Sequence, residues 1–273
     1  MIIIGEKINA SIPSIREAII NREGGKLLKT ATDQAEAGAS YIDVNVGTGE
    51  GTSVHEIQSM QWLIGLLREK NDYLFCIDSA DTNVLKAGLE AAQDKAGLIN
   101  SVKGTDTSIS EILSLSAEFQ VPVIGLAMDE KGIPMDVAGR IRACEKIARG
   151  AEKHGVPHEH IYFDPLVLPL STDSAQGMVT LDTIREIKKE FPDAKTVLAL
   201  SNVSYGLPER SLINVALLHM AMFLSVDAVL LNPLDPAIKA ALLSAQVILG
   251  KDRHSRRYTR ACRQGLILSG ARR

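Results

Sequence analysis

The chain contains few aromatic residues and few cysteines. Phe, Trp and Tyr make up only 4% of its 273 residues, which argues against a surface that stacks nucleic-acid bases. The three cysteines, Cys76, Cys144 and Cys262, show no CxxC spacing, so we expect reduced thiols in a cytoplasmic protein rather than a disulfide framework. No cationic segment precedes a long apolar stretch at the start, and polar residues interrupt the apolar stretch 212–232. We therefore expect neither a signal peptide nor a membrane partner.

The chain also lacks a large net charge. The formal charge of −3 provides no general field for binding nucleic acid or another polyanion. The charge is uneven, because residues 251–273 hold eight Lys and Arg against one Asp, a net of +7, which leaves about −10 on the remainder. We therefore expect a domain over 1–250 and a basic C-terminal tail over 251–273. The tail is either solvated or a docking patch for a partner.

Short apolar runs recur along the chain, and each is followed by a helical pattern. Runs of four to six residues rich in Val, Ile and Leu are typical of strands that are buried on both faces of a parallel sheet. The expected strands are 2–4, 41–44, 73–77, 97–99, 122–126, 161–163, 196–200 and 228–231. The expected helices are 26–37, 54–69, 82–92, 109–119, 136–154, 181–190, 210–224 and 236–249. Eight such units without a composition break predict an α/β protein with a single (β/α)8 TIM barrel.

Polar side chains stand at or shortly after the carboxyl ends of most of the expected strands. They are Glu6, Asn9, Asp43, Asn45, Asp78, Asn100, Asp129, Asp164, Ser201, Asn202, Asn232 and Asp235, and the apolar Met128 stands beside Asp129. The carboxyl ends of barrel strands carry the ligand groups of such enzymes. These positions hold no His, and Cys76 lies within a strand, so we expect no protein-bound metal. We also expect no lysine at a strand end, which disfavours a Schiff-base mechanism.

Carboxylates accept hydrogen bonds, and amides both donate and accept them. This set suits a flat heterocycle such as a pterin, whose amino-pyrimidinone edge offers two adjacent N–H donors to one carboxylate. An Asp or Asn after a strand is often only a helix cap or a turn residue. That explanation is less satisfactory for Asp78, Asn100, Asp164 and Asn202 taken together.

The segments that hold these residues resemble the pterin-binding barrel family, and most closely the methyltetrahydrofolate:corrinoid protein methyltransferases. The matching segments are IIIGEKIN, DVNVG (43–47), WLIGLL (62–67), CIDS (76–79), LINS (98–101), IGLAMDEKGIP (124–134), YFDPLVLP (162–169) and KTVLALSNVSYGLPERSLIN (195–214). The likeness runs from about residue 1 to residue 249.

The resemblance implies a homodimeric barrel of pterin-binding type that holds methyltetrahydrofolate and exchanges its methyl group with cobalamin on a corrinoid protein. It implies that Asp78, Asn100 and Asp164 bind the pterin, with help from the backbone near Ser201, and that Asn202 approaches N5. The further candidates for the binding site are Glu6, Asp43, Asn45, Met128 and Arg210. Arg210 either supplies charge at the rim or only positions its loop.

Two residues depart from the pattern that the resemblance implies. Asp129 stands where an amide is expected, and Asn232 stands where an acid is expected. Two other functions remain open. A dihydropteroate synthase is disfavoured because DVNVG lacks a phosphate-handling Ser-Thr-Arg-Pro sequence and no Lys/Arg pair ends the last two strands. A non-catalytic folate-binding module would need the pterin ligands but no donor at N5.

Overall fold

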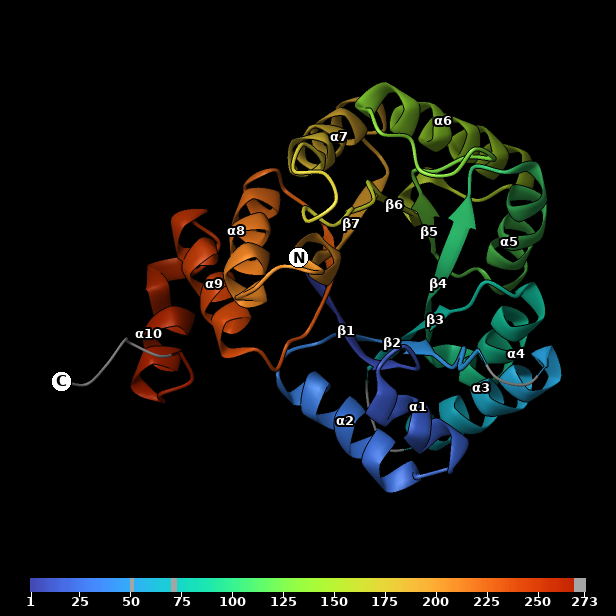
Figure 1. Ribbon diagram of the computed structural model, residues 1–273, viewed down its shortest axis with the longest axis horizontal. Helices are drawn as coiled ribbons and strands as arrows, with labels where there is room; N and C mark the ends of the chain where they lie inside the picture. Colours follow the sequence, from blue (N-terminus) through green and yellow to red (C-terminus); the bar gives the residue numbers. More distant parts are fainter. Residues whose placement is uncertain (50–51, 70–72, 268–273) are drawn as a thin grey trace.

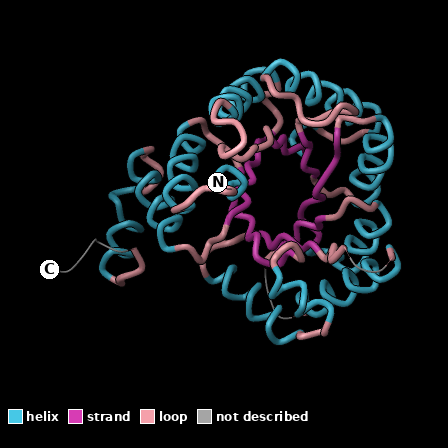
Figure 2. The backbone as a smooth tube through the Cα atoms, viewed as in Figure 1, coloured by secondary structure: helices cyan, strands magenta, loops and turns pink. Residues whose placement is uncertain are grey.

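The computed structural model describes residues 1–49, 52–69 and 73–267. In these residues eight parallel strands close into a barrel in chain order, each paired with its sequence neighbours and β1 with β8. The strands are β1 (Ile2–Asn9), β2 (Tyr41–Asn45), β3 (Leu74–Asp78), β4 (Ala96–Lys103), β5 (Val123–Leu126), β6 (Ile161–Asp164), β7 (Lys195–Ala199) and β8 (Ala228–Leu231). Figure 1 and Figure 2 show the ring of strands enclosed by helices. The expected (β/α)8 barrel is confirmed.

Helices form the outer layer. They are α1 (Pro13–Ile20), α2 (Gly24–Glu36), α3 (Ser53–Arg68), α4 (Thr82–Ala92), α5 (Asp106–Phe119), α6 (Val137–His154), α7 (Gln176–Glu190), α8 (Arg210–Phe223), α9 (Pro236–Ile248) and α10 (Arg256–Arg263). Short 3-10 turns are η1 (Gln93–Lys95), η2 (His158–His160), η3 (Leu200–Ser204) and η4 (Arg253–Ser255). Local chemistry sets several boundaries: Asp136 Oδ1 accepts from Gly139 N at 2.7 Å at the start of α6, and Gly155 ends that helix at φ +70°.

Apolar side chains fill both sides of the strands. Inside the barrel, Ile4, Cys76 and Leu98 belong to one buried cluster with Ile124, Tyr162, Val197 and Ala228. Outside it, two larger clusters pack the strands against the helices. Burial on both faces explains why the strands are continuous apolar runs. The polar residues therefore collect where the runs end, at the carboxyl edge of the barrel.

The residues after 250 that the structure describes form η4 and α10. Ala261 and Ile267 are buried, whereas Arg256, Arg260 and Arg263 are exposed. Figure 1 shows α10 at the outer side of α9, away from the barrel. Residues 268–273 of the expected tail lie outside the described residues. The division of the chain at residue 250 and a docking role for its end stay predictions.

Candidate functional site

Two neighbouring strands bring a pair of carboxylates to the mouth of the barrel. Asn45 of β2 pairs in register with Asp78 of β3, and its Nδ2 donates to Asp78 Oδ2 at 2.9 Å. Asn100 of β4 donates from Nδ2 to Asp43 Oδ1 at 3.3 Å. Each amide thus donates to one acid on another strand, and four of the expected site residues, from three strands, lie together.

The cluster carries acids that are shielded from water. Asp43 is fully buried, and no described residue donates a hydrogen bond to its Oδ2. Burial, followed by the like charge of Asp78, raises the pKa of Asp43 well above its ordinary value. Burial also raises the pKa of Asp78 to about 6, although the hydrogen bond from Asn45 opposes that shift. These acids thus retain acceptor capacity that the protein itself does not satisfy.

A third buried acid, Asp164, ends β6. The residue is 6% exposed, and its Oδ1 accepts from Leu166 N at 2.8 Å. Burial raises its pKa to about 6, while the Leu166 N–H and the charge of Arg140 lower it. No described residue donates a hydrogen bond to its second oxygen, so this oxygen is available to a ligand.

Arg140 of α6 is a residue that the sequence reasoning missed. It is fully buried, and no acid among the described residues lies within ion-pair distance of it. Its guanidinium donates to backbone oxygens of Pro134 (3.0 Å), Pro165 (2.9 Å) and Leu166 (2.8 Å), and to Gln176 Oε1 (2.8 Å). It therefore connects the segments that follow β5 and β6 to the start of α7. An isolated Arg in an amphipathic helix gives no sequence signal for such a role.

Next to β2 at the mouth, β1 is joined to the segment after β7. Ser201 of η3 donates from Oγ to Glu6 Oε1 at 2.7 Å and Oε2 at 3.0 Å. Arg210 donates from Nη2 to Ser201 O at 2.7 Å and from Nε to Ser204 Oγ at 3.0 Å. Burial raises the pKa of Glu6, and the Ser201 hydrogen bond lowers it. Arg210 thus contacts its own loop and also lines the neighbouring cavity, and its two expected roles stay predictions.

That cavity has a volume of about 680 Å³. Its lining includes Glu6, Ser201, Asn202 and Arg210, together with Lys7, Asn9, Ser11, Ile12, Asn214, Asn232 and Asp235. Asn202 is exposed, and its side-chain amide makes no hydrogen bond to any described residue. It is therefore a free donor and acceptor at the wall of the cavity.

Lys7 corrects the expectation that no lysine stands at a strand end. The strand β1 continues to Asn9, and its pairing with β2 shifts between Gly5 and Ile8. This bulge places two residues of β1 opposite Asp43 alone, and such an irregularity re-aims side chains. Glu6 and Lys7 consequently both line the cavity. Lys103 is also the last residue of β4.

The remaining candidates, Met128, Asp129 and Asn232, differ in whether they reach the large cavity. Met128 O accepts from Gly104 N at 2.8 Å next to the end of β5, and nothing in the structure tests a ligand role for its side chain. Asp129 Oδ1 accepts from Lys131 N at 2.8 Å and so stabilises a turn. Asn232 lines the large cavity, and its Oδ1 accepts from Leu234 N at 3.1 Å. Of the two departures, only Asn232 therefore reaches this cavity.

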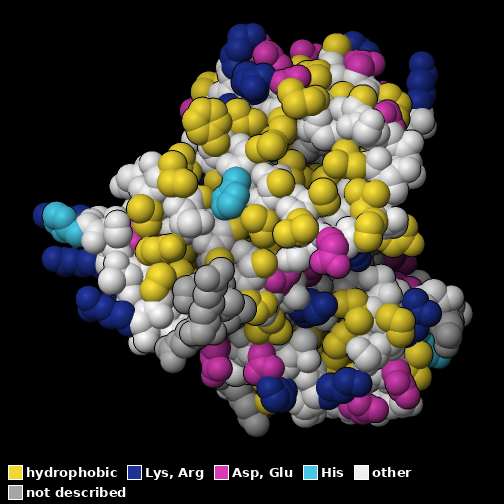
Figure 3. Space-filling model, turned by 60° about the vertical axis from the view of Figure 1, so that its left-hand side comes forward, with side chains coloured by type: hydrophobic (Ala, Val, Ile, Leu, Met, Phe, Trp, Pro, Cys, Tyr) yellow, Lys and Arg dark blue, Asp and Glu magenta, His cyan; other side chains and the backbone are white. Residues whose placement is uncertain are grey.

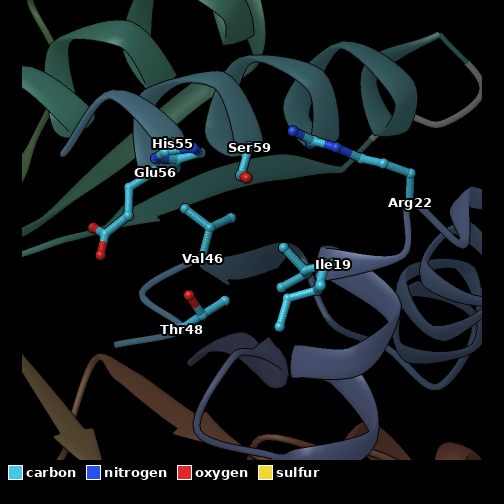
Figure 4. Close-up of a pocket in the computed structure, with 8 residues that line it drawn as sticks. Ile19, Arg22, Val46, Thr48, His55, Glu56 and Ser59 are labelled. Carbon is cyan, nitrogen blue, oxygen red and sulfur yellow. The ribbon is translucent and has the colours of Figure 1, made fainter. Parts of the chain in front are cut away.

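Two further cavities continue around the rim. One of about 620 Å³ is lined by Asn45, Asp78 and Glu56 among others. The other, of about 280 Å³, lies between α1, the residues after β2, and α3. Figure 4 shows Arg22, Val46 and His55 around it, together with Ile19, Thr48, Glu56 and Ser59. Glu56 lines both, but the smaller one contains none of the expected site residues.

The family follows from a comparison with known proteins. A family model described as "Pterin binding enzyme" matches residues 5–232. The chain belongs to this family. The fold and the resemblance that the sequence motifs indicated are thus confirmed.

Relatives within the family differ in how much of the chain they share. The methylcorrinoid:tetrahydrofolate methyltransferase of Eubacterium limosum is 34% identical over 269 residues, which is 98% of each chain. The methionine synthase of Mycobacterium tuberculosis is 29% identical over 245 residues, which is 85% of this chain and 20% of that protein. The expected class of enzyme, a folate–corrinoid methyltransferase, agrees with the full-length match and is confirmed.

A solved structure supports the fold of this pterin-binding enzyme independently. The 7,8-dihydropteroate synthase from Vibrio fischeri ES114 superposes with a TM-score of 0.73, covering 92% of this chain and 93% of that chain. At 17% identity, the likeness shows the shared barrel alone. Within the described ranges, no helix is long and apolar enough to cross a bilayer, and no three His, Cys, Asp or Glu are grouped to hold a metal ion.

Proposed function

We propose that this enzyme exchanges a methyl group between N5 of tetrahydrofolate and the cobalt of a corrinoid protein. The observation that carries the proposal is the free Asn202 amide, which lines a cavity at the barrel mouth where buried acids also end their strands. The printed name of the Eubacterium limosum relative describes transfer from a methylcorrinoid to tetrahydrofolate. We propose the same substrates here, with that direction as the first to be assayed.

The acids provide the ligands for the pterin. Asp78 and Asp164 each keep acceptor capacity, and Asp43 has an oxygen with no donor among the described residues. A buried acceptor without a partner is costly, and the N–H groups of an amino-pyrimidinone edge would supply the missing donors. Asn100 adds an amide beside them. Asn45, Glu6, Ser201, Met128 and Arg210 complete the proposed wall.

Asn202 serves the reacting atom. When a methyl group leaves N5, the nitrogen must accept an electron pair and become a better leaving group through a proton or a hydrogen bond. When the methyl group arrives, the same nitrogen attacks and develops positive charge. The Asn202 amide can hydrogen-bond N5 in both directions of transfer, because it donates from Nδ2 and accepts at Oδ1 without titrating. Preorganised donors of this kind stabilise developing charge strongly.

The partner protein supplies the cobalt, which takes or gives the methyl group. The residues of this chain hold the pterin by its amino-pyrimidinone edge and orient N5 toward the mouth, where the partner must approach. Neither methyl donor nor acceptor needs a covalent bond to the enzyme. We also propose that the chain acts as a homodimer, as the resemblance implies.

The Asn202→Ala variant tests the proposal. With methyltetrahydrofolate and cob(I)alamin, or methylcobalamin and tetrahydrofolate, the cobalt spectrum reports transfer in either direction. We expect Asn202→Ala to lower kcat by about 100-fold, as is typical for the loss of one preorganised donor, while the Kd for folate changes little. The exposed Asn83→Ala on α4 is the matched control and should keep full activity.

Other outcomes separate the alternatives. Tight folate binding without methyl transfer, also with a corrinoid protein as acceptor, would indicate a binding module. An Asn202→Ala variant as fast as the wild type would remove the proposed role of this residue. A wild-type protein that fails to bind folate would overturn the assignment of the site as a whole.

A further inference from the structure

The pterin ring itself determines where the rest of a folate must lie, given the proposed function. The tail of p-aminobenzoyl and glutamate is attached at C6, the ring atom next to N5. With the amino-pyrimidinone edge held at the ends of β3, β4 and β6 and N5 facing Asn202 after β7, the tail leaves the ring on the side of β7, β8 and β1. The cavity of about 680 Å³ lies on that side.

The walls of this cavity match the parts of such a tail. Ile12 and Leu230 offer apolar surface to an aromatic ring, while Asn9 and Ser11 offer polar groups near the segment between β1 and α1. The volume is within the range of small-molecule sites, roughly 300–1,000 Å³. It therefore has room for p-aminobenzoylglutamate beyond the pterin.

Four charged residues line the cavity, and three of them already have partners. Glu6 accepts from Ser201, Arg210 donates to Ser201 and Ser204, and Asp235 accepts from Ser211 Oγ at 2.9 Å and from Ala237 N at 2.8 Å. The side-chain ammonium of Lys7 makes no hydrogen bond or ion pair to any described residue. Its charge lowers the pKa of nearby Glu6, although burial raises that pKa more strongly, and its three N–H donors are available to an anionic ligand.

The backbone holds Lys7 in this position. The bulge in β1 aims Glu6 and Lys7 to the same side. The Lys7 N–H, which the shifted pairing releases from β2, donates to Oε1 of the fully buried Gln34 at 2.9 Å. Gln34 also fills the space beside Gly5, where an added Cβ would lie 2.5 Å from Oε1. The bulge, stabilised by the hydrogen bond to Gln34, thus fixes the backbone of Lys7 at the cavity.

We propose that Lys7 binds the glutamate carboxylate of the folate tail and that this cavity is the tail's subsite. The Lys7 ammonium and a carboxylate form a charge-assisted hydrogen bond, while Asn202 acts at N5 independently. Lys7 then contributes to folate affinity and to discrimination against tail-less pterins, but not to the chemical step.

The test compares two methyl donors with free cob(I)alamin as the acceptor. One is 5-methyltetrahydrofolate, and the other is 5,6-dimethyltetrahydropterin, which lacks the tail. We expect Lys7→Gln to raise KM for the folate about tenfold, the equivalent of about 1.4 kcal/mol, with kcat unchanged. KM for the dimethyltetrahydropterin should not change, and Lys7→Arg should behave as wild type.

Lys103→Gln, at the end of β4 and outside this cavity, is the matched control and should alter neither KM. An equal rise in KM for both donors, or no rise for the folate, would overturn the proposal. If the wild type binds folate but transfers no methyl group, the proposed function fails while dissociation constants for the same two ligands still decide the subsite. If Lys7→Gln does not fold, the affinities of the wild type decide the proposal. Equal affinity for the folate and for the dimethyltetrahydropterin would overturn the proposed subsite. Tighter binding of the folate than of the dimethyltetrahydropterin, weakened by salt, would support it.

Discussion

At the scale of single residues, the site contains acids that the described residues supply with too few hydrogen-bond donors. Asp43, Asp78 and Asp164 all have a pKa raised by burial. A folded-state pKa above the unfolded value means that their protonated forms favour folding at low pH, and that this contribution is lost as the pH rises through the folded pKa. At neutral pH these acids therefore oppose folding, as is typical of acids that serve a functional site.

Folate binding should weaken in acid. Asp78 and Asp164 have pKa values of about 6, and a protonated carboxyl group loses acceptor capacity toward the pterin N–H groups. We expect the Kd for tetrahydrofolate, measured by calorimetry, to rise about tenfold for each pH unit below 6 if one acid must be ionised, and more steeply for two. Asp78→Asn should bind more weakly with a shallower profile. A flat Kd between about pH 5 and pH 8 would contradict the role of both acids.

At the scale of elements, three features arrange the site around the regular barrel. The bulge in β1 adds Lys7 to the cavity, η3 presents Ser201 and Asn202, and Arg140 of α6 ties together the segments after β5 and β6. Each feature departs from a simple strand–helix repeat. Irregular backbone held by specific hydrogen bonds is a common way to position functional groups.

Loss of Arg140 should destabilise the protein. The Arg140→Met variant keeps an unbranched side chain but leaves the buried carbonyl of Pro165 and Oε1 of Gln176 without their donor, whereas Leu166 O still accepts from Thr180 Oγ1. We expect urea unfolding to show a loss of about 2–4 kcal/mol in the free energy of unfolding, with weaker folate binding because Asp164 is adjacent. The exposed Arg142→Met on the same helix should change stability by less than about 0.5 kcal/mol. Equal effects of the two substitutions would show that the bracing is unimportant.

At the scale of the whole molecule, large exposed apolar side chains gather on the outer surface of α8 and the end of α9. Leu212, Met220 and Phe223 of α8 are 68%, 53% and 76% exposed, and Ile248 at the end of α9 is 84% exposed. Figure 3 brings this side forward and shows hydrophobic side chains gathered over it. An extended apolar patch of this kind is typical of protein–protein interfaces. It is the face that best suits the proposed homodimer.

A charge on this face should disrupt such a dimer. We expect Phe223→Glu to shift the protein from dimer to monomer in sedimentation experiments, because a carboxylate buried in an apolar interface lacks a partner. Met178 on α7 is 59% exposed, so Met178→Glu is the matched control and should leave the dimer intact. A wild-type protein that sediments as a monomer at all concentrations would contradict the homodimer. Dissociation by both variants would place the interface elsewhere or extend it.

The amino-acid sequence by itself determined the barrel and the acids and amides at its mouth. Period and composition are local properties. Apolar runs such as 161–163 and 228–231 indicate strands that are buried on both faces, and a polar residue such as Asp78 or Asp164 marks where the apolar run ends. The motifs around Asn202 likewise indicated the family, which the comparisons confirmed.

Only the tertiary structure decided which of these groups have partners and which are free. Gln34 of α2 braces the bulge that turns Lys7 inward, and Arg140 reaches carbonyls about 25 residues away in the sequence. Hydrogen bonds between such distant segments have no periodic signal in the chain, because they depend on how helices pack against the closed barrel. The same packing removes Asp43 from water and leaves Asn202 exposed. Solvation and partners, set by the folded molecule, thus distinguish otherwise similar residues at the ends of the strands.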